Sequence, residues 1–273
     1  MKRVLGAAVL HDEALSGGCV GDVRKLTLSD GRTVVAKFGQ GAALEGRMLR
    51  YLAAQSQLPV PAVLEVTENL LVMEFVATAG GINAAVETDA AEHLALLHSV
   101  TATGFGFDFD TVIGGLAQPN AWTADWHDFF REHRLLYMAR AAHDAGQLPA
   151  RTFRRVESLA ARLDRWIAAS AKPSLIHGDM WTGNVLCRSG KVAAFVDPAI
   201  YFADAEIELA FSTLFGTFGP AFFRRYGELR PIAPGFFEER RDLYNLYPLL
   251  VHVRLFGGSY VAQVERTLTK FGV

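Results

Sequence analysis

The first 76 residues carry short apolar runs separated by turn residues, a pattern that predicts β-structure. The dipeptide Asp30-Gly31 is typical of a tight turn, so the runs on either side of it predict a hairpin. Leu44, Met48 and Leu52 recur at helical spacing and predict one amphipathic helix. Together these segments predict a small sheet of about five strands with one helix. The strand-forming runs cover residues 20–28, 33–38, 63–66 and 70–76.

Beyond residue 76 the pattern changes to the longer apolar spacing of helices. The composition shifts at residues 77–81, directly after the last predicted strand, and this shift predicts a hinge. We therefore expect an α+β protein with two lobes, a β-rich N-lobe at residues 1–76 and a mainly helical C-lobe at residues 77–273. The C-lobe segments expected to be helical are residues 88–99, 123–145, 151–169, 205–216 and a long region from 235, with one β-hairpin at 184–197.

Composition narrows the class of protein. The chain has 273 residues, 51% of them hydrophobic and 21% charged, which is enough for a full core. Its net charge of -2 gives no electrostatic reason to expect nucleic acid or an anionic membrane as partner. The two cysteines, Cys19 and Cys187, predict neither a disulfide framework nor structural zinc. The apolar run at residues 4–10 is too short for a signal peptide or a membrane span, so we expect a cytoplasmic protein.

The stretch LIHGDMWTGNVLC at residues 175–187 is the first candidate for chemistry. His177, Asp179 and Asn184 interrupt what otherwise reads as buried strand. An unpaired polar group inside a core costs about 1–3 kcal/mol. A chain tolerates such a cost most often at a functional site.

The predicted hairpin at residues 184–197 returns Asp197 to the neighbourhood of Asn184. An amide oxygen and a carboxylate suit Mg²⁺, which commonly takes further ligands from water and from substrate phosphates, so the pair implies a nucleotide. Asp179, a carboxylate outside this pair, could accept the proton of an attacking hydroxyl, as phosphoryl transfer requires. The hairpin alone leaves an alternative open, in which Asp179 makes an Asx-turn and Asn184 caps the strand.

Two features upstream favour phosphoryl transfer. The turn SGGCVGD at residues 16–22 contains Gly17 and Gly18, whose bare backbone could approach phosphates, although most such turns are only turns. Lys37 on a strand and Glu45 on the next helix could form a pair that aims the lysine at the phosphates of a nucleotide. Either residue could instead be solvated. A glycine turn, a lysine, a helix glutamate and the later Asp/Asn/Asp set are unlikely to occur in this order by chance.

With these motifs in place, the chain resembles the fructosamine kinase (ketosamine kinase) family, which has a protein-kinase-like fold and is itself similar to aminoglycoside phosphotransferases. The resemblance covers nearly the whole chain, and the most specific blocks are HGDMWTGN and the following DPA. Further matching blocks are SGGCVGDV, VVAKF, LVMEFV, FGFDFDTVIGG, QPNAWTADWHDFFREHRL, FADAEIELA, LFGTF and LYNLYPLLVHVRLFGGSY.

The resemblance implies a role for each matching residue. Asp179 would be the catalytic base, Asn184 and Asp197 the Mg²⁺ ligands, Lys37 a contact to the ATP phosphates and Glu45 the residue that orients Lys37. Adenine would be held by the backbone of Glu74 and Val76, with Met73 beside it as gatekeeper. The implied activity is ATP- and Mg²⁺-dependent phosphorylation of the 3-hydroxyl of a ketosamine, free or on a protein lysine, which leads to deglycation.

Two other functions stay open from the sequence. The chain could be a small-molecule phosphotransferase with an aminoglycoside, choline-like or sugar acceptor, or a nucleotide-binding module without catalysis, which the intact catalytic set argues against. A ketosamine carries a protonatable amine, so acidic or aromatic residues near Asp179 are expected to bind it. The candidates are Trp126, Trp181, Asp204 and Glu206.

Four positions depart from the family pattern, the first of them Asp204, which replaces a histidine. Ala205 replaces an arginine, which could alter substrate contacts, and Pro248 replaces a histidine and could kink a helix. Glu208 replaces an aspartate, and we expect its side chain to brace the catalytic loop.

Cys19 lies inside the predicted phosphate loop. Loop amides directed at this site would stabilise a thiolate, so we expect a redox-sensitive thiol, although an inert half-buried cysteine is the alternative. The protein is expected to be a monomer that forms a Cys19-linked dimer under oxidation.

Overall fold

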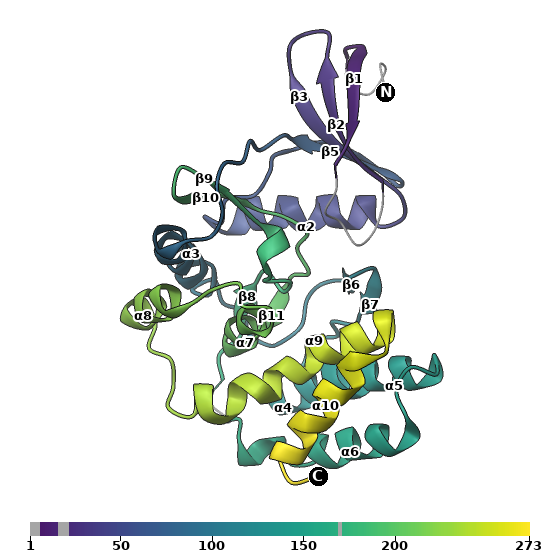
Figure 1. The fold of residues 1–273 in the computed structure, drawn as a ribbon, viewed down its shortest axis with the longest axis vertical. Helices are drawn as coiled ribbons and strands as arrows, with labels where there is room; N and C mark the ends of the chain where they lie inside the picture. Colours follow the sequence, from purple (N-terminus) through teal and green to yellow (C-terminus); the bar gives the residue numbers. More distant parts are fainter. Residues whose placement is uncertain (1–5, 16–21, 169–170) are drawn as a thin grey trace.

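The computed structural model describes residues 6–15, 22–168 and 171–273 (Figure 1). Its N-terminal part is a five-stranded antiparallel sheet in the order β1-β2-β3-β5-β4. Gly17, Gly18 and Cys19 lie outside the described residues, so the expectations for the phosphate loop stay predictions. The strands of the sheet are β1 (Val9–Ala14), β2 (Asp22–Leu28), β3 (Thr33–Phe38), β4 (Val63–Thr67) and β5 (Leu70–Glu74).

The hairpin predicted around Asp30-Gly31 is confirmed, because β2 and β3 pair antiparallel with Thr27 opposite Thr33. The predicted amphipathic helix is α2 (Ala42–Gln55), which packs on the β4–β5 side of the sheet. Met48 and Leu52 are buried as the helical spacing predicted. This packing fixes the direction of α2 relative to β3, the strand that carries Lys37.

The remainder of the chain is mainly helical (Figure 1). The longest helix, α9, is buried on most of its sides and packs against α5, α7 and α10. It continues through Pro248 without interruption. The helices are α3 (Ala84–Leu97), α4 (Trp126–Phe129), α5 (Tyr137–Asp144), α6 (Ala150–Ala160), α7 (Glu206–Leu214), α8 (Pro220–Leu229), α9 (Arg241–Phe256) and α10 (Ser259–Lys270), with π-helical turns at Phe130–Leu136 and Phe236–Arg240 and 3-10 turns at Leu163–Arg165 and Thr182–Asn184.

One helix prediction is wrong, and one helix was missed. The segment 151–169 is not one helix, because α6 ends at Ala160 and the backbone leaves the helical region at Arg162, where φ is -132°. The buried Leu163 is instead delivered to the core by a short turn. Helix α8 was not predicted, although Gly219-Pro220 is a recognisable start signal with proline in the first helical turn.

Short strand pairs connect the helices and shape the centre of the molecule. The hairpin predicted at residues 184–197 is confirmed as β9 (Val185–Arg188) and β10 (Lys191–Phe195), which pair antiparallel. Two further pairs were not predicted, and each of their strands has only three residues. They are β6 (Thr111–Ile113) with β7 (Leu116–Gln118), and β8 (Ser174–Ile176) with β11 (Tyr201–Ala203).

Among the described residues, none of the helices is both long and apolar enough to cross a bilayer. The expected cytoplasmic location stays a prediction.

Candidate active site

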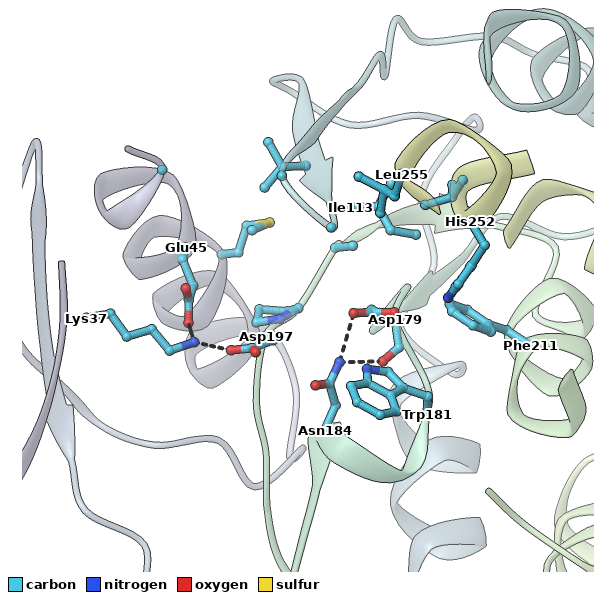
Figure 2. Close-up of a pocket in the computed structure, with 18 of the residues that line it drawn as sticks. Lys37, Glu45, Ile113, Asp179, Trp181, Asn184, Asp197, Phe211, His252 and Leu255 are labelled. Atoms are coloured by element: carbon cyan, nitrogen blue, oxygen red, sulfur yellow. Dashed lines mark hydrogen bonds and ion pairs between the residues drawn. The ribbon is translucent and has the colours of Figure 1, made fainter. Parts of the chain in front are cut away.

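A cavity of about 820 Å³ lies between the N-terminal sheet with α2 and the helical part of the chain. Its wall includes the start of α2, the β6–β7 hairpin, the loops around β9 and β10, and parts of α7, α9 and α10. Figure 2 shows that the residues predicted for phosphoryl transfer meet here. They are Lys37, Glu45, Asp179, Asn184 and Asp197.

The pairing predicted between Lys37 and Glu45 is present, with Lys37 Nζ 2.7 Å from Glu45 Oε1. Lys37 Nζ also forms an ion pair with Asp197 (Figure 2). Burial alone would lower the pKa of Lys37, but the two carboxylates outweigh it and raise the pKa. Lys37 therefore stays charged in the wall of the cavity, where it can bind an anion such as a phosphate.

The β9–β10 hairpin brings Asp197 next to Asn184, as the sequence predicted. Val196 N–H donates to the backbone oxygen of Asn184 at 3.0 Å, one residue before Asp197. Asp197 has φ 54°, a left-handed conformation that aspartate tolerates better than most residues. A non-glycine residue in this conformation is typical of functional sites, where the surrounding structure holds the strain.

Asp179 receives two contacts from one amide group. Asn184 Nδ2 donates to the backbone oxygen of Asp179 at 2.8 Å and to its carboxylate at 2.9 Å. Burial raises the pKa of Asp179 to about 7, the nearby Asp197 and Glu208 charges add to the shift, and the Asn184 hydrogen bond opposes it. A carboxylate with this pKa can accept a proton near neutral pH.

The loop that carries Asp179 is held by Glu208 from α7. Its carboxylate accepts the backbone N–H of Gly178 at 2.7 Å and that of His177 at 3.2 Å. This confirms the predicted brace, although the side chain is longer than the usual aspartate. Gly178 itself is required, because its φ is +87° and a Cβ there would lie 2.1 Å from the Ala199 oxygen.

A buried polar chain continues behind Glu208. His98 Nε2 lies 2.8 Å from its carboxylate, and His98 Nδ1 lies 2.7 Å from the hydroxyl of Tyr226. Burial would raise the pKa of Glu208, but the contacts to His98 and the loop amides outweigh it and lower the pKa. His98 therefore has a structural role, and His177 is fully buried beside the same carboxylate.

The donor set fits a small divalent cation that is also bound to phosphates. Because Asn184 Nδ2 is occupied by Asp179, the amide oxygen of Asn184 points to the other side, the side of Asp197 (Figure 2). No cluster of three or more His, Cys, Asp or Glu residues in the described ranges could hold a metal alone. An ion at Asn184 and Asp197 would therefore need further ligands from water or nucleotide, which is how Mg²⁺ commonly binds.

The residues expected around adenine do not line this cavity. Met73 is buried at the end of β5, and the Glu74 N–H donates to the Ala62 oxygen at 2.9 Å. A nucleotide could therefore contact Glu74 only through other groups, such as its carbonyl. Val76 follows in the segment that joins β5 to α3.

Trp181 is the one tentative acceptor residue that lines the cavity. Its ring lies over Gly183, where a Cβ would be 2.3 Å from the ring. The spacing of one residue between Trp181 and Gly183 thus lets the indole pack on bare backbone and face Asp179 (Figure 2).

The placement expected for the other three acceptor candidates is wrong. Trp126 is buried and donates from Nε1 to the Tyr244 hydroxyl at 2.9 Å, and Tyr244 donates to Asp204 at 2.7 Å. Glu206 pairs with Arg240 at 2.5 and 2.9 Å. Burial raises the pKa of Asp204 to about 6, with a further contribution from the Glu206 charge. These contacts join the start of α7 to α4 and α9, so the residues are used for packing.

Sequence reasoning also missed one whole wall of the cavity. The residues concerned come from β6, α7, α9 and α10; α9 and α10 follow each other directly, but β6 and α7 are distant from them and from each other in the chain. They are Val112, Ile113, Phe211, Phe215, Val251, His252, Leu255, Phe256 and Tyr260.

Comparison with known protein families shows the family of this chain. A family model described as fructosamine kinase matches residues 2–271. The chain belongs to the fructosamine kinase family. A probable ketoamine kinase of Synechocystis is 41% identical over 181 residues, which are 65% of this chain and 59% of that protein, so the match spans less than two thirds of this relative. A rice protein named protein-ribulosamine 3-kinase, chloroplastic, is 31% identical over 90% of this chain and 74% of its own.

Similar solved structures support this family assignment and the fold. A fructosamine-3-kinase candidate from Thermobifida fusca has a TM-score of 0.87 at 29% identity and covers 98% of this chain and 96% of its own. An aminoglycoside phosphotransferase in complex with ADP and hygromycin B has a TM-score of 0.69 at 18% identity over 100% of this chain and 97% of its own. At that identity it shows the fold alone. The predicted α+β, protein-kinase-like fold is confirmed.

Proposed function

We propose that this fructosamine kinase family member transfers the γ-phosphoryl group of ATP to a sugar hydroxyl of a ketosamine, the 3-hydroxyl, on a free amine or a protein lysine. The observation that carries the proposal is the meeting of Lys37, Glu45, Asp179, Asn184 and Asp197 in one cavity of a chain that belongs to this family. The phosphate ester on the sugar then destabilises the adduct and leads to deglycation.

Each residue has a task set by its position. Lys37, held by Glu45, binds the phosphates of the nucleotide. Asn184 and Asp197 would hold Mg²⁺, which would neutralise charge on the phosphates. Asp179 accepts the proton of the acceptor hydroxyl as the oxygen–phosphorus bond forms and the bond to ADP breaks. The Asn184 amide keeps the Asp179 carboxylate in the orientation that this transfer needs.

The two parts of the chain divide the work in this proposal. The N-lobe, residues 1–76, binds the nucleotide, with Gly17 and Gly18 near the phosphates and Met73, Glu74 and Val76 near adenine. The C-lobe, residues 77–273, supplies catalysis and binds the acceptor. Of the acceptor candidates, Trp181 is the one that lines the cavity, and we assign it to acceptor binding.

The test is an acceptor screen by ATP consumption. Lysine derivatives of ribulose, erythrulose and fructose are compared with an aminoglycoside, choline and free fructose. We expect turnover with at least one ketosamine. We expect little turnover with free fructose, because it lacks the amine that the acceptor site is expected to bind. Turnover only with an aminoglycoside or choline would contradict the ketosamine assignment, and tight ATP binding without turnover of any acceptor would favour a non-catalytic module.

A further inference from the structure

The end of the cavity away from Lys37 is walled by aromatic rings. The centroid of the His252 ring lies 4.9 Å from those of Phe215 and Tyr260 and 5.7 Å from that of Phe256. Phe215 follows α7, Phe256 ends α9 and Tyr260 begins α10, so three elements meet at this wall. Phe215 is 40% exposed and Phe256 is 56% exposed although both line the cavity. We call Phe215, Phe256 and Tyr260 the aromatic mouth.

Charge is distributed unevenly over this cavity. Lys37, Glu45 and Asp197 lie at one end of it, and Asp179 lies between them and His252 (Figure 2). His252 favours its neutral form, because burial lowers its pKa more than the hydrogen bond from its Nδ1 to the Pro248 oxygen, at 2.7 Å, raises it. Among the described residues that line the cavity, none at the aromatic mouth carries a positive charge.

If the proposed function holds, phosphoryl transfer determines how an acceptor is oriented in the cavity. The nucleotide phosphates occupy the side of Lys37, and the reacting hydroxyl must lie at Asp179. The rest of the acceptor therefore extends away from Lys37. In a ketosamine that remainder is the amine nitrogen and the group attached to it, so this group reaches the aromatic mouth.

We propose that the aromatic mouth binds an apolar carrier group on the ketosamine nitrogen and discriminates against a carboxylate next to that nitrogen. The faces of the aromatic rings can bury the apolar surface of the group attached to the nitrogen. The same faces attract the protonated amine through cation–π contacts. A carboxylate bound at the aromatic mouth would lose part of its hydration shell, and no cationic side chain at the mouth would compensate for that loss. The favoured acceptors are ketosamines on simple apolar amines or on the methylene chain of a lysine, and the disfavoured ones are those on the α-amine of a free amino acid.

The experiment compares three acceptors with the same sugar, fructose attached to benzylamine, to methylamine and to the nitrogen of glycine. For the wild type we expect kcat/KM to be about tenfold higher for the benzylamine compound than for the methylamine compound, and lowest for the glycine compound. In Phe256→Ala the ratio of benzylamine to methylamine should fall about tenfold, with the KM for ATP unchanged. Phe256→Tyr should keep the ratio, which separates loss of the ring face from general damage.

Phe237→Ala is the matched control, because Phe237 is 41% exposed and does not line the cavity. It should leave all three kcat/KM values as in the wild type. Equal kcat/KM for the three compounds in the wild type would overturn the inference while leaving the proposed function in place. An unchanged ratio in a folded Phe256→Ala variant would also overturn it. No turnover of any of the three would overturn the inference, and the acceptor screen with the ribulose and erythrulose derivatives would then decide the proposed function.

Discussion

Gly178→Ala tests how closely the loop of Asp179 is fitted to its surroundings. Gly178 has φ +87°, so an alanine there costs about 1–2 kcal/mol in backbone strain alone. The new Cβ would also lie 2.1 Å from the Ala199 oxygen and 2.7 Å from its carbon, so backbone has to move. That movement threatens the 2.8 Å bond from Ala199 N–H to the His177 oxygen and the 2.7 Å bond from Gly178 N–H to Glu208.

Those two bonds set the expected size of the effect. The neutral bond contributes about 1 kcal/mol and the bond to the carboxylate about 1.5–3 kcal/mol. With strain included, loss of both bonds in Gly178→Ala should lower the free energy of unfolding by about 3.5–6 kcal/mol. It should also lower kcat, because Asp179 is the next residue.

The control for this prediction is Gly146→Ala. Gly146 has φ +73° but no atom within 4 Å of a Cβ, so it reports the strain without the clash, about 1–2 kcal/mol. Urea unfolding followed by tryptophan fluorescence gives both values. Equal losses in the two variants would refute the reasoning, because the contact between Gly178 and Ala199 would then have no energetic consequence.

Three further predictions follow from the site. Asp179→Asn should keep Mg-ATP affinity and lose turnover, whereas Asp197→Asn should weaken Mg-ATP binding itself; calorimetric titration would contradict the roles if both lost affinity equally. The pKa of Glu208 is lowered below its ordinary 4.5, so its stabilisation is present above that pH and is lost as pH falls through the folded value, and Glu208→Gln should show a shallower acid dependence of unfolding. Gly183→Ala should displace Trp181 and raise KM for the ketosamine but not for ATP.

The parts of the site that the sequence predicted are those fixed by local chain geometry. A short turn at Ser189 and Gly190 returns Asp197 to Asn184, and this follows from strand pairing alone. Lys37 and Glu45 were paired through the order of strand and helix, which the apolar spacing revealed.

The parts that were missed depend on tertiary packing. Phe215, His252 and Tyr260 meet only because α7, α9 and α10 pack together, which no spacing in the sequence encodes. Trp126 and Asp204 were misplaced because they were chosen by residue type, one aromatic and the other acidic, yet Tyr244 links them inside the core. Residue type alone cannot distinguish a buried network from a binding wall.

The measurement that tests the central claim most directly is phosphorus NMR of the reaction of ATP with fructose-derived Nε-lysine. The account predicts one new phosphate monoester on the sugar, at the 3-hydroxyl, in an amount equal to the ADP formed, and no ester with Asp179→Asn. ADP formed with inorganic phosphate alone, or a phosphate ester formed equally well by Asp179→Asn, would contradict it.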